Sequence, residues 1–197
     1  MTTVRSVRKS DRRSQLLTAA EQLIAERGFP AVRLEDIGAA AGVSGPAIYR
    51  HFSNKEALLV ELLVGVSTRL LQGAQAVIAD APDAAAALDG LIEFHLDFAL
   101  GEPNLIRIQD RDLASLPPTA QRQVRLAQRR YVETWVSVLR TLDPDRAEDD
   151  ARLMAHAVFG LLNSTPHSVR SADRRRSRAV LRAMTAAALG QDLVRAQ

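Results

Sequence analysis

Cysteine is absent from this 197-residue chain, and aromatic residues make up only 4% of it. Without cysteine there is no disulfide bond, no thiolate metal site and no cysteine nucleophile. No apolar run approaches the length of a membrane span, and the basic N-terminus is not followed by an apolar signal segment. We therefore expect a cytoplasmic protein that does not enter a membrane.

Catalytic motifs are also missing. The sequence has no glycine-rich phosphate loop, no Gly-x-Ser-x-Gly elbow and no His-Glu-x-x-His metal motif. Its carboxylate pairs, such as Asp149-Asp150 and Asp110 with Asp112, are interpreted as helix-start and loop charges. The histidines form no His-x-x-x-His pair, so we expect no metal site, no cofactor and no enzyme.

Strand signals are lacking, whereas apolar residues recur at helical spacing. The sequence shows no period-two alternation and no Asn-Gly hairpin signal. Its 47% hydrophobic content is ample for a packed core. Glycine and proline divide the chain into segments, and we predict an all-α fold of about nine helices without a sheet. These helices cover 11–27, 34–41, 45–52, 53–79, 83–100, 103–113, 119–141, 146–166 and 173–190.

Residues 34–56 have the pattern of a helix-turn-helix. Gly42 follows a helical run and suits the left-handed conformation that ends a helix. A helix advances about 100° per residue, so Ile48 and Phe52 share one face and can close a small core with Ile37 and Val43. The opposite face carries small and polar groups, a pattern that favours entry into a DNA major groove. These groups are Pro46, Ala47 and Arg50, flanked by Tyr49 and His51.

Two helix starts follow from capping residues in this stretch. Ser44 can cap the second helix of the motif. Ser53 and Glu56 match the capping box at the start of the next helix. Lys55 would then lie in the first turn, where the helix dipole disfavours a cation. A bound anion such as a DNA phosphate would offset that cost, although a solvated lysine remains the alternative.

Several short motifs around this stretch agree in order and spacing. They are Gly28-Phe29, Asp36-Ile37, Ala41-Gly42-Val43-Ser44, Ile48-Tyr49, His51-Phe52 and Lys55-Glu56-Ala57-Leu58. Together they resemble the DNA-binding domain of TetR-family transcriptional regulators over roughly residues 10–65. The chain departs from the family pattern in two places: Val32-Arg33 replaces a frequent threonine pair, and Gly45-Pro46-Ala47 replaces x-Gly-Thr.

The resemblance implies a repressor that a small, largely apolar ligand releases from a double-stranded DNA operator. On this interpretation Ala47 and Arg50 contact bases, and Gly45 and Pro46 form the helix start beside them. The phosphate contacts would come from Arg33, Ser44, Tyr49, His51 and Lys55.

The distribution of positive charge supports a DNA-binding role for the N-terminal part of the chain. Residues 1–55 carry nine basic and five acidic side chains, although the net charge of the whole chain is only +3. We expect residues 1–9 to be a disordered basic arm that either contacts DNA or serves as a solubilising tail. Residues 10–55 would form the DNA-binding domain, and 56–197 the ligand-binding and dimerisation domain. A continuous helix from Ser53 would join the two.

The last two predicted helices have apolar faces that could bind a second copy of the chain. TetR-like regulators resemble one another in forming dimers through a four-helix bundle, and a two-fold dimer would read two half-sites in register with the duplex. The alternative is that these faces complete the chain's own core. The faces consist of Leu153, Met154, Ala157, Val158, Leu161 and Leu162, and of Val180, Leu181, Met184, Ala187 and Ala188.

Residues 94–159 contain five of the chain's eight aromatic residues. Apolar aromatic pockets with a few polar groups are common ligand sites. For each aromatic residue, however, ordinary core packing is the more common role. The aromatic candidates are Phe94, Phe98, Tyr131, Trp135 and Phe159. The polar candidates are His95, Arg107, His156 and Asn163.

Two arginine clusters admit more than one interpretation. The first could bind the phosphates of an acyl-coenzyme A, a ligand class that some TetR-like regulators sense, or form a solvated face. We interpret the second as surface. The clusters are Arg122, Arg125, Arg129 and Arg130, and Arg170, Arg174, Arg175, Arg176 and Arg178. An α-helical enzyme and a small-molecule carrier remain the alternatives to a regulator.

Overall fold

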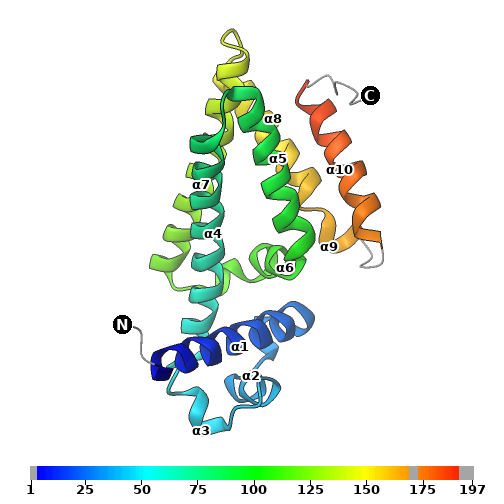
Figure 1. The fold of residues 1–197 in the computed structure, drawn as a ribbon. Coiled ribbons are helices and arrows are strands. Elements are labelled where there is room, and N and C mark those ends of the chain that lie inside the picture. Colours follow the sequence, from blue (N-terminus) through cyan, green and yellow to red (C-terminus); the bar gives the residue numbers. More distant parts are fainter. Residues whose placement is uncertain (1–3, 169–172, 191–197) are drawn as a thin grey trace. The chain divides into compact units, whose positions relative to one another are not determined.

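The computed structural model describes residues 4–168 and 173–190, which form helices α1 to α10 and two short 3-10 helices (Figure 1). No strand occurs within these two ranges, and the predicted all-α fold is confirmed. The chain divides into two compact units. The first comprises Met1–Val66 and Arg107–Val124, and the second comprises Ser67–Ile106 and Arg125–Gln197.

The first unit is built from long and short helices around a small apolar core. Its elements are α1 (Val4–Arg27), η1 (Phe29–Ala31), α2 (Leu34–Ala40), α3 (Gly45–Ile48), the first part of α4 (Lys55–Asp80), the end of α6 (Pro103–Asp112), η2 (Leu113–Ser115) and the start of α7 (Pro118–Leu142). Leu16, Ala20 and Ile24 recur along α1 at helical spacing and are fully buried. Gly28 ends this helix with φ +86°.

Helix α1 begins earlier than the sequence predicts. It extends back to Val4, so residues 4–9 are helical where we expected a disordered arm. The arginines and lysine of this segment are good helix formers, and extending a helix that is already nucleated costs little. The first three residues of the expected arm lie outside the described residues.

A buried carboxylate secures the end of α1. Asp112 is only 3% exposed, and its Oδ1 accepts a hydrogen bond from the backbone N–H of Phe29 at 3.3 Å. Arg111 donates to Asp112 at 2.9 Å and to the carbonyl oxygen of Ala25 at 3.4 Å. Asp112 is therefore a structural group, whereas the sequence suggested an ordinary loop charge.

The second unit has a larger core around Trp135. It contains the rest of α4, α5 (Ala84–Gly101), the start of α6, most of α7, α8 (Glu148–Leu162), α9 (Thr165–Ser168) and α10 (Arg174–Ala188). Asp83 caps α5 by accepting from the backbone N–H of Ala86 at 2.8 Å. The hydroxyl of Thr165 donates to the carbonyl oxygen of Ala99 at 2.7 Å. This segment forms the short helix α9, where the sequence indicated a break.

A row of ion pairs joins α10 to α5 within the second unit. Arg178 pairs with Glu93 and Asp97, and Arg182 pairs with Asp89 and Glu93, the last contact at 2.6 Å. Burial favours protonation of Glu93, but the hydrogen bonds from both arginines outweigh it and lower the pKa of this carboxyl. Arg178 is therefore a structural residue, which corrects its interpretation as free surface charge.

Helix α4 differs from one expectation. By length and composition it could cross a membrane, whereas we expected no apolar run of that length. Its Leu58, Leu59 and Leu63 are fully buried within the first unit, and buried core helices meet the same criterion. In the structure the first compact unit extends along α4 to Val66.

Candidate functional site

Three side chains close the core of the helix-turn-helix. Ile37 and Ile48 are fully buried, and Phe52 is 2% exposed. Gly38 lets α2 approach α3, because a Cβ atom there would lie 3.5 Å from the Cβ of Ile48 and 3.2 Å from the carbonyl oxygen of Val43. Val43 itself is only partly buried. The predicted cluster is therefore present, with Val43 at its edge.

The turn and the short helix α3 set the direction of the next residues. Gly42 has φ +66°, the left-handed conformation expected at the end of α2. Helix α3 is only four residues long, but the backbone N–H of Phe52 still donates to Ile48 at 3.0 Å. Helical bonding thus continues past α3, and Arg50 stays close to one helical turn from Ala47.

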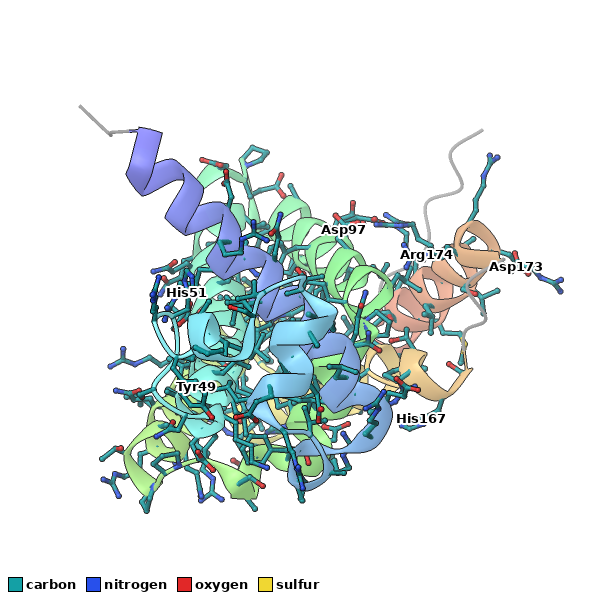
Figure 2. The ribbon with its side chains drawn as sticks, turned by 90° about the horizontal axis from the view of Figure 1, so that it is seen from below. Tyr49, His51, Asp97, His167, Asp173 and Arg174 are labelled. Atoms are coloured by element: carbon teal, nitrogen blue, oxygen red, sulfur yellow. The ribbon has the colours of Figure 1, made fainter. Side chains whose placement is uncertain are left out.

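The face opposite this core is open. Tyr49 is 51% exposed, and Pro46 and Arg50 are exposed as well. Arg33 and Ser44 are exposed at the starts of α2 and α3, and the Ser44 side chain makes no capping bond within the described part of the chain. Ala47 and His51 are partly buried. Figure 2 views the molecule from below and labels Tyr49 and His51.

Tyr49 has a partner that the sequence did not indicate. Its hydroxyl donates to Oε1 of Glu35 at 2.5 Å, which links the turn after α3 to the first turn of α2. This hydrogen bond lowers the pKa of Glu35 and raises the pKa of Tyr49. Glu35 therefore orients the Tyr49 ring on the exposed face.

Arg13 connects three parts of the first unit. Its guanidinium donates to the carbonyl oxygen of His51 at 2.5 Å and through Nε to Glu61 at 2.8 Å. It also lies 4.2 Å from the centre of the Phe52 ring. Arg13 thus holds α1, the turn after α3 and α4 together. The sequence gave no sign of this role.

Lys55 is engaged within the protein. Its Nζ donates to the carbonyl oxygens of Phe29, Pro30 and Val32 at 3.0, 3.3 and 3.2 Å. The cap of α4 is Asn54, whose Oδ1 accepts from the N–H of Ala57 at 2.7 Å. The predicted Ser53 capping box is wrong by one residue, since Asn caps a helix as well as Ser. The carbonyls account for the lysine in the first turn without an anion.

Four of the five aromatic candidates gather around His95 in the second unit. The rings of Tyr131 and Phe159 stack near it, with centroids 5.8 and 5.1 Å away. Phe98 and Trp135 meet it edge-on at 5.8 and 6.2 Å. The residues come from α5, α7 and α8, so the structure unites side chains that are far apart in the sequence.

His95 lies in a buried polar chain. Its Nδ1 is 2.9 Å from the Tyr131 hydroxyl, and its Nε2 is 3.0 Å from Oδ1 of Asn163. Burial lowers the pKa of His95 to about 4, and the hydrogen bond to Asn163 opposes only part of that shift. Burial also raises the pKa of Tyr131. Both groups are neutral at physiological pH.

Three ligand candidates lie outside this ring cluster. The partly buried Phe94 ring covers Gly73, where a Cβ atom would lie 2.2 Å from it. His156 is exposed, and Arg107 belongs to the first unit. Helical spacing alone could not reveal which side of each helix faces the interior, so these three residues were grouped with the others.

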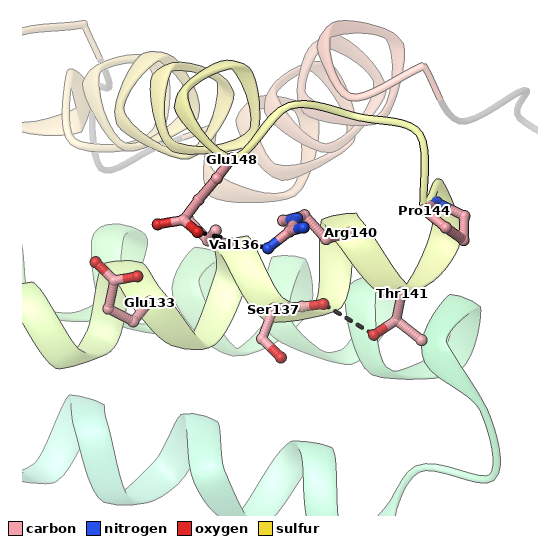
Figure 3. Close-up of a pocket in the computed structure, with 7 residues that line it drawn as sticks. All are labelled: Glu133, Val136, Ser137, Arg140, Thr141, Pro144 and Glu148. Atoms are coloured by element: carbon pink, nitrogen blue, oxygen red, sulfur yellow. Dashed lines mark hydrogen bonds and ion pairs between the residues drawn. The ribbon is translucent and has the colours of Figure 1, made fainter.

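The second unit also has an open pocket of about 420 Å³ beside α7 and the start of α8 (Figure 3). Arg140 lies 3.5 Å from Glu148 there, and Arg152 pairs with Glu148 at 2.6 Å and with Glu133. The hydroxyl of Thr141 donates to the carbonyl oxygen of Ser137 at 2.9 Å. This lining is mostly polar, and it contains none of the predicted ligand residues.

Two family models match the chain in succession. The model of bacterial regulatory proteins of the tetR family matches residues 16–62. The tetracyclin repressor-like C-terminal domain matches residues 81–191, which is more than half of the chain. The chain belongs to the TetR family. TetR-family proteins are DNA-binding transcriptional regulators and not enzymes, and the match places the helix-turn-helix in the DNA-binding part.

Individual TetR-family proteins are similar over different lengths. The chain is 38% identical over 84 residues to the transcriptional repressor KstR2 of Rhodococcus jostii, covering 43% of this chain and 41% of that protein. It is 32% identical over 120 residues to the transcriptional activator FasR of Mycolicibacterium smegmatis, covering 60% and 54%. The matched stretch thus spans about half the length of these relatives.

A solved structure confirms the fold over nearly the whole chain. The TetR-family regulator of Bordetella parapertussis superposes with a TM-score of 0.82, covering 90% of this chain and 93% of that one. The sequence identity is 20%, so the comparison bears on the fold alone.

Proposed function

We propose that this TetR-family regulator is a repressor that binds operator DNA as a homodimer and is released by a small, largely apolar ligand. The observation that carries the proposal is the division of residues 45–52 into two faces. Ile48 and Phe52 close the core, while Arg50 and Tyr49 are exposed on the other side. Exposed polar groups held by a rigid core are what a recognition helix requires.

The exposed side chains of the helix-turn-helix suggest which residues contact DNA. Arg50 and Ala47 approach base edges in the major groove, with Gly45 and Pro46 at the helix start. The hydroxyl of Ser44 and the guanidinium of Arg33 approach phosphates, which set position and not sequence. The Tyr49 hydroxyl reaches a phosphate by exchanging its hydrogen bond to Glu35 for one to the DNA. Lys55 supports the loop at Phe29, so we assign it no phosphate. His51 contributes chiefly through its carbonyl oxygen, which accepts from Arg13.

The homodimer would form through α8 and α10. Both helices expose apolar or small side chains at the same spacing, Leu153, Ala157 and Gly160 on one and Val180, Met184 and Ala187 on the other. Leu153 is 69% exposed and Met184 is 50% exposed, an unusual state for large apolar groups. Val158, Leu162 and Leu181 are buried within their own chain, which removes them from the predicted dimer face.

The ligand would act in the second unit, at the ring cluster around His95. Helix α4 is one uninterrupted helix from Lys55 to Asp80 and contributes residues to both units. A ligand that binds better to one position of α4 would change the spacing of the two recognition helices in the dimer. Only its differential affinity for the two states can drive release.

A gel-shift experiment with the DNA upstream of the chain's own coding region tests the proposal. We expect a discrete complex that resists excess competitor of unrelated sequence and weakens as salt rises. A signal that unrelated DNA competes away equally well would contradict sequence-specific binding. Mass spectrometry of small molecules that co-purify with the protein would then identify the ligand. Adding that ligand should dissociate the protein–DNA complex.

A further inference from the structure

The Tyr49 hydroxyl is already bound to a carboxylate in the free protein. It donates to Oε1 of Glu35 at 2.5 Å, so the residue that ends α3 is tied to the first turn of α2. A hydroxyl carries one hydrogen and cannot donate to Glu35 and to a DNA phosphate at the same time. Both acceptors are anionic oxygens, which form the stronger class of hydrogen bond. The carboxylate therefore occupies the donor that a phosphate would take.

The start of α2 leaves Glu35 available for this contact. Residues 28–52 contain only one other acid, Asp36. Oδ2 of Asp36 accepts a hydrogen bond from the backbone N–H of Arg33 at 3.0 Å, so this carboxylate caps its own helix. Glu35 is exposed. Asp36 is thus used by the helix start, and Glu35 meets Tyr49.

Glu35 carries a charge that opposes DNA binding. The hydrogen bond from Tyr49 lowers the pKa of its carboxyl, the charge of Arg33 acts in the same direction and Asp36 opposes it, so the group is ionised at neutral pH. The proposed DNA contacts Arg33 and Arg50 are exposed cations of the same helix-turn-helix. A carboxylate among them is repelled by the phosphate backbone that they attract. Occupation of the Tyr49 hydroxyl and charge repulsion therefore act in the same direction.

We propose that Glu35 is an internal competitor of the operator phosphates, whose carboxylate holds the Tyr49 hydroxyl in the free protein and limits how tightly the regulator binds DNA. The inference rests on the proposed function and assigns an affinity-setting role to a residue outside the recognition helix. Binding breaks the hydrogen bond to Glu35 and forms one to a phosphate oxygen, so Glu35 is left to water. If Glu35 served only to orient Tyr49 for DNA, its replacement would weaken binding.

Glu35→Gln separates competition from orientation. It keeps the length of the side chain but removes the charge, which weakens the hydrogen bond from Tyr49. We expect its affinity for the operator duplex selected by the unaltered protein to rise by about tenfold, because a dimer makes the exchange twice. Fluorescence anisotropy measures this affinity. Glu26→Gln removes a carboxylate from an exposed position of α1 and should change the affinity by less than about twofold. Unchanged or weaker binding by Glu35→Gln would overturn the inference.

Tyr49→Phe separates competition from charge repulsion through space. Without the hydroxyl there is no hydrogen bond to exchange, so adding Glu35→Gln to Tyr49→Phe should raise the affinity by no more than about threefold. An equal gain with and without the hydroxyl would leave charge repulsion as the whole effect and would also overturn the inference. Glu35 and Tyr49 are both exposed, so we expect all three variants to fold.

NMR tests the hydrogen bond in the free protein. The chain has two tyrosines, so protein labelled with ¹³C-tyrosine gives two sets of ring signals, and Tyr49→Phe identifies those of Tyr49. Glu35→Gln should move the Tyr49 signals and leave those of the buried Tyr131 in place. Unmoved Tyr49 signals would show that Glu35 does not hold the hydroxyl, and the inference would fail.

The same measurements separate this inference from the proposed function. Sequence-specific binding by the unaltered protein that Glu35→Gln does not strengthen rejects only the role of Glu35. Absence of sequence-specific binding by the unaltered protein rejects the proposed function itself.

Discussion

The Nζ atom of Lys55 lies 3.0 Å from the carbonyl oxygen of Phe29 and 4.5 Å from the centre of its ring. With Pro30 and Val32 as further acceptors, all three ammonium donors have partners. We predict that Lys55→Ala lowers the free energy of unfolding by about 2 kcal/mol, because hydrogen bonds to a charged group are lost. Urea unfolding measures this change.

Arg33→Ala is the matched control for Lys55→Ala. The exposed Arg33 side chain should change the free energy of unfolding by less than about 0.5 kcal/mol, while its loss weakens operator binding. A Lys55→Ala protein of unaltered stability would contradict the assigned structural role.

The Arg13 contacts predict coupling between stability and DNA affinity. Arg13→Met removes the hydrogen bond to His51 and the ion pair with Glu61. Both side chains of the pair are more than one-third exposed, so a double-mutant cycle with Glu61→Gln should give a coupling of only about 1 kcal/mol. Operator affinity should fall severalfold because the turn that carries Arg50 loosens. Arg27→Met, at an exposed position of α1, is the control and should change neither quantity.

The ion pairs between α5 and α10 predict a stability difference that depends on pH. The pKa of Glu93 is lowered from its ordinary value of 4.5, so its stabilising effect is present at neutral pH and is lost as the pH falls through the folded-state pKa. Glu93→Gln should destabilise the protein at neutral pH by about 1 kcal/mol, a value reduced by solvent screening. In acid the free energies of unfolding of the unaltered protein and of Glu93→Gln should become equal. A constant difference at every pH would contradict the prediction.

His95 also predicts a loss of stability in acid, because its buried imidazole is neutral in the folded protein. Its pKa is lowered from 6.5 to about 4, so the unfolded chain binds a proton that the folded chain refuses between these values. The free energy of unfolding should therefore fall by roughly 3 kcal/mol as the pH drops through this range. His95→Gln should remove that part of the pH dependence. NMR of His95 should show no titration near its ordinary pKa of 6.5.

The helix-turn-helix could be predicted because its information is local. Ile37, Ile48 and Phe52 face one another through helical periodicity and a glycine turn, which are visible within one short stretch. The cap of α4 was misplaced because Ser53 and Asn54 are adjacent and cap equally well. The function of Lys55 depends on carbonyl groups more than twenty residues away, and no spacing rule reports them.

In the second unit, residue type was easier to predict than side-chain direction. Four of the five aromatic candidates lie together, but only tertiary packing shows that Phe94 covers Gly73 while Phe98 meets His95. The apolar faces of α8 and α10 divide similarly. Val158 is buried in its own chain, while Leu153 is exposed, and both lie on an apolar stripe of α8.

Selection of binding sites from random-sequence duplexes tests most directly whether the Ile48 and Phe52 core presents Arg50 to DNA. The account predicts that the unaltered protein selects two half-sites about one DNA turn apart, and that Arg50→Ala relaxes the preference at one symmetric position in each. Ser44→Ala, a phosphate-contact control, should weaken binding without changing the selected sequence. If Arg50→Ala selects the same sequence with the same affinity as the unaltered protein, Arg50 does not read DNA and the account is contradicted.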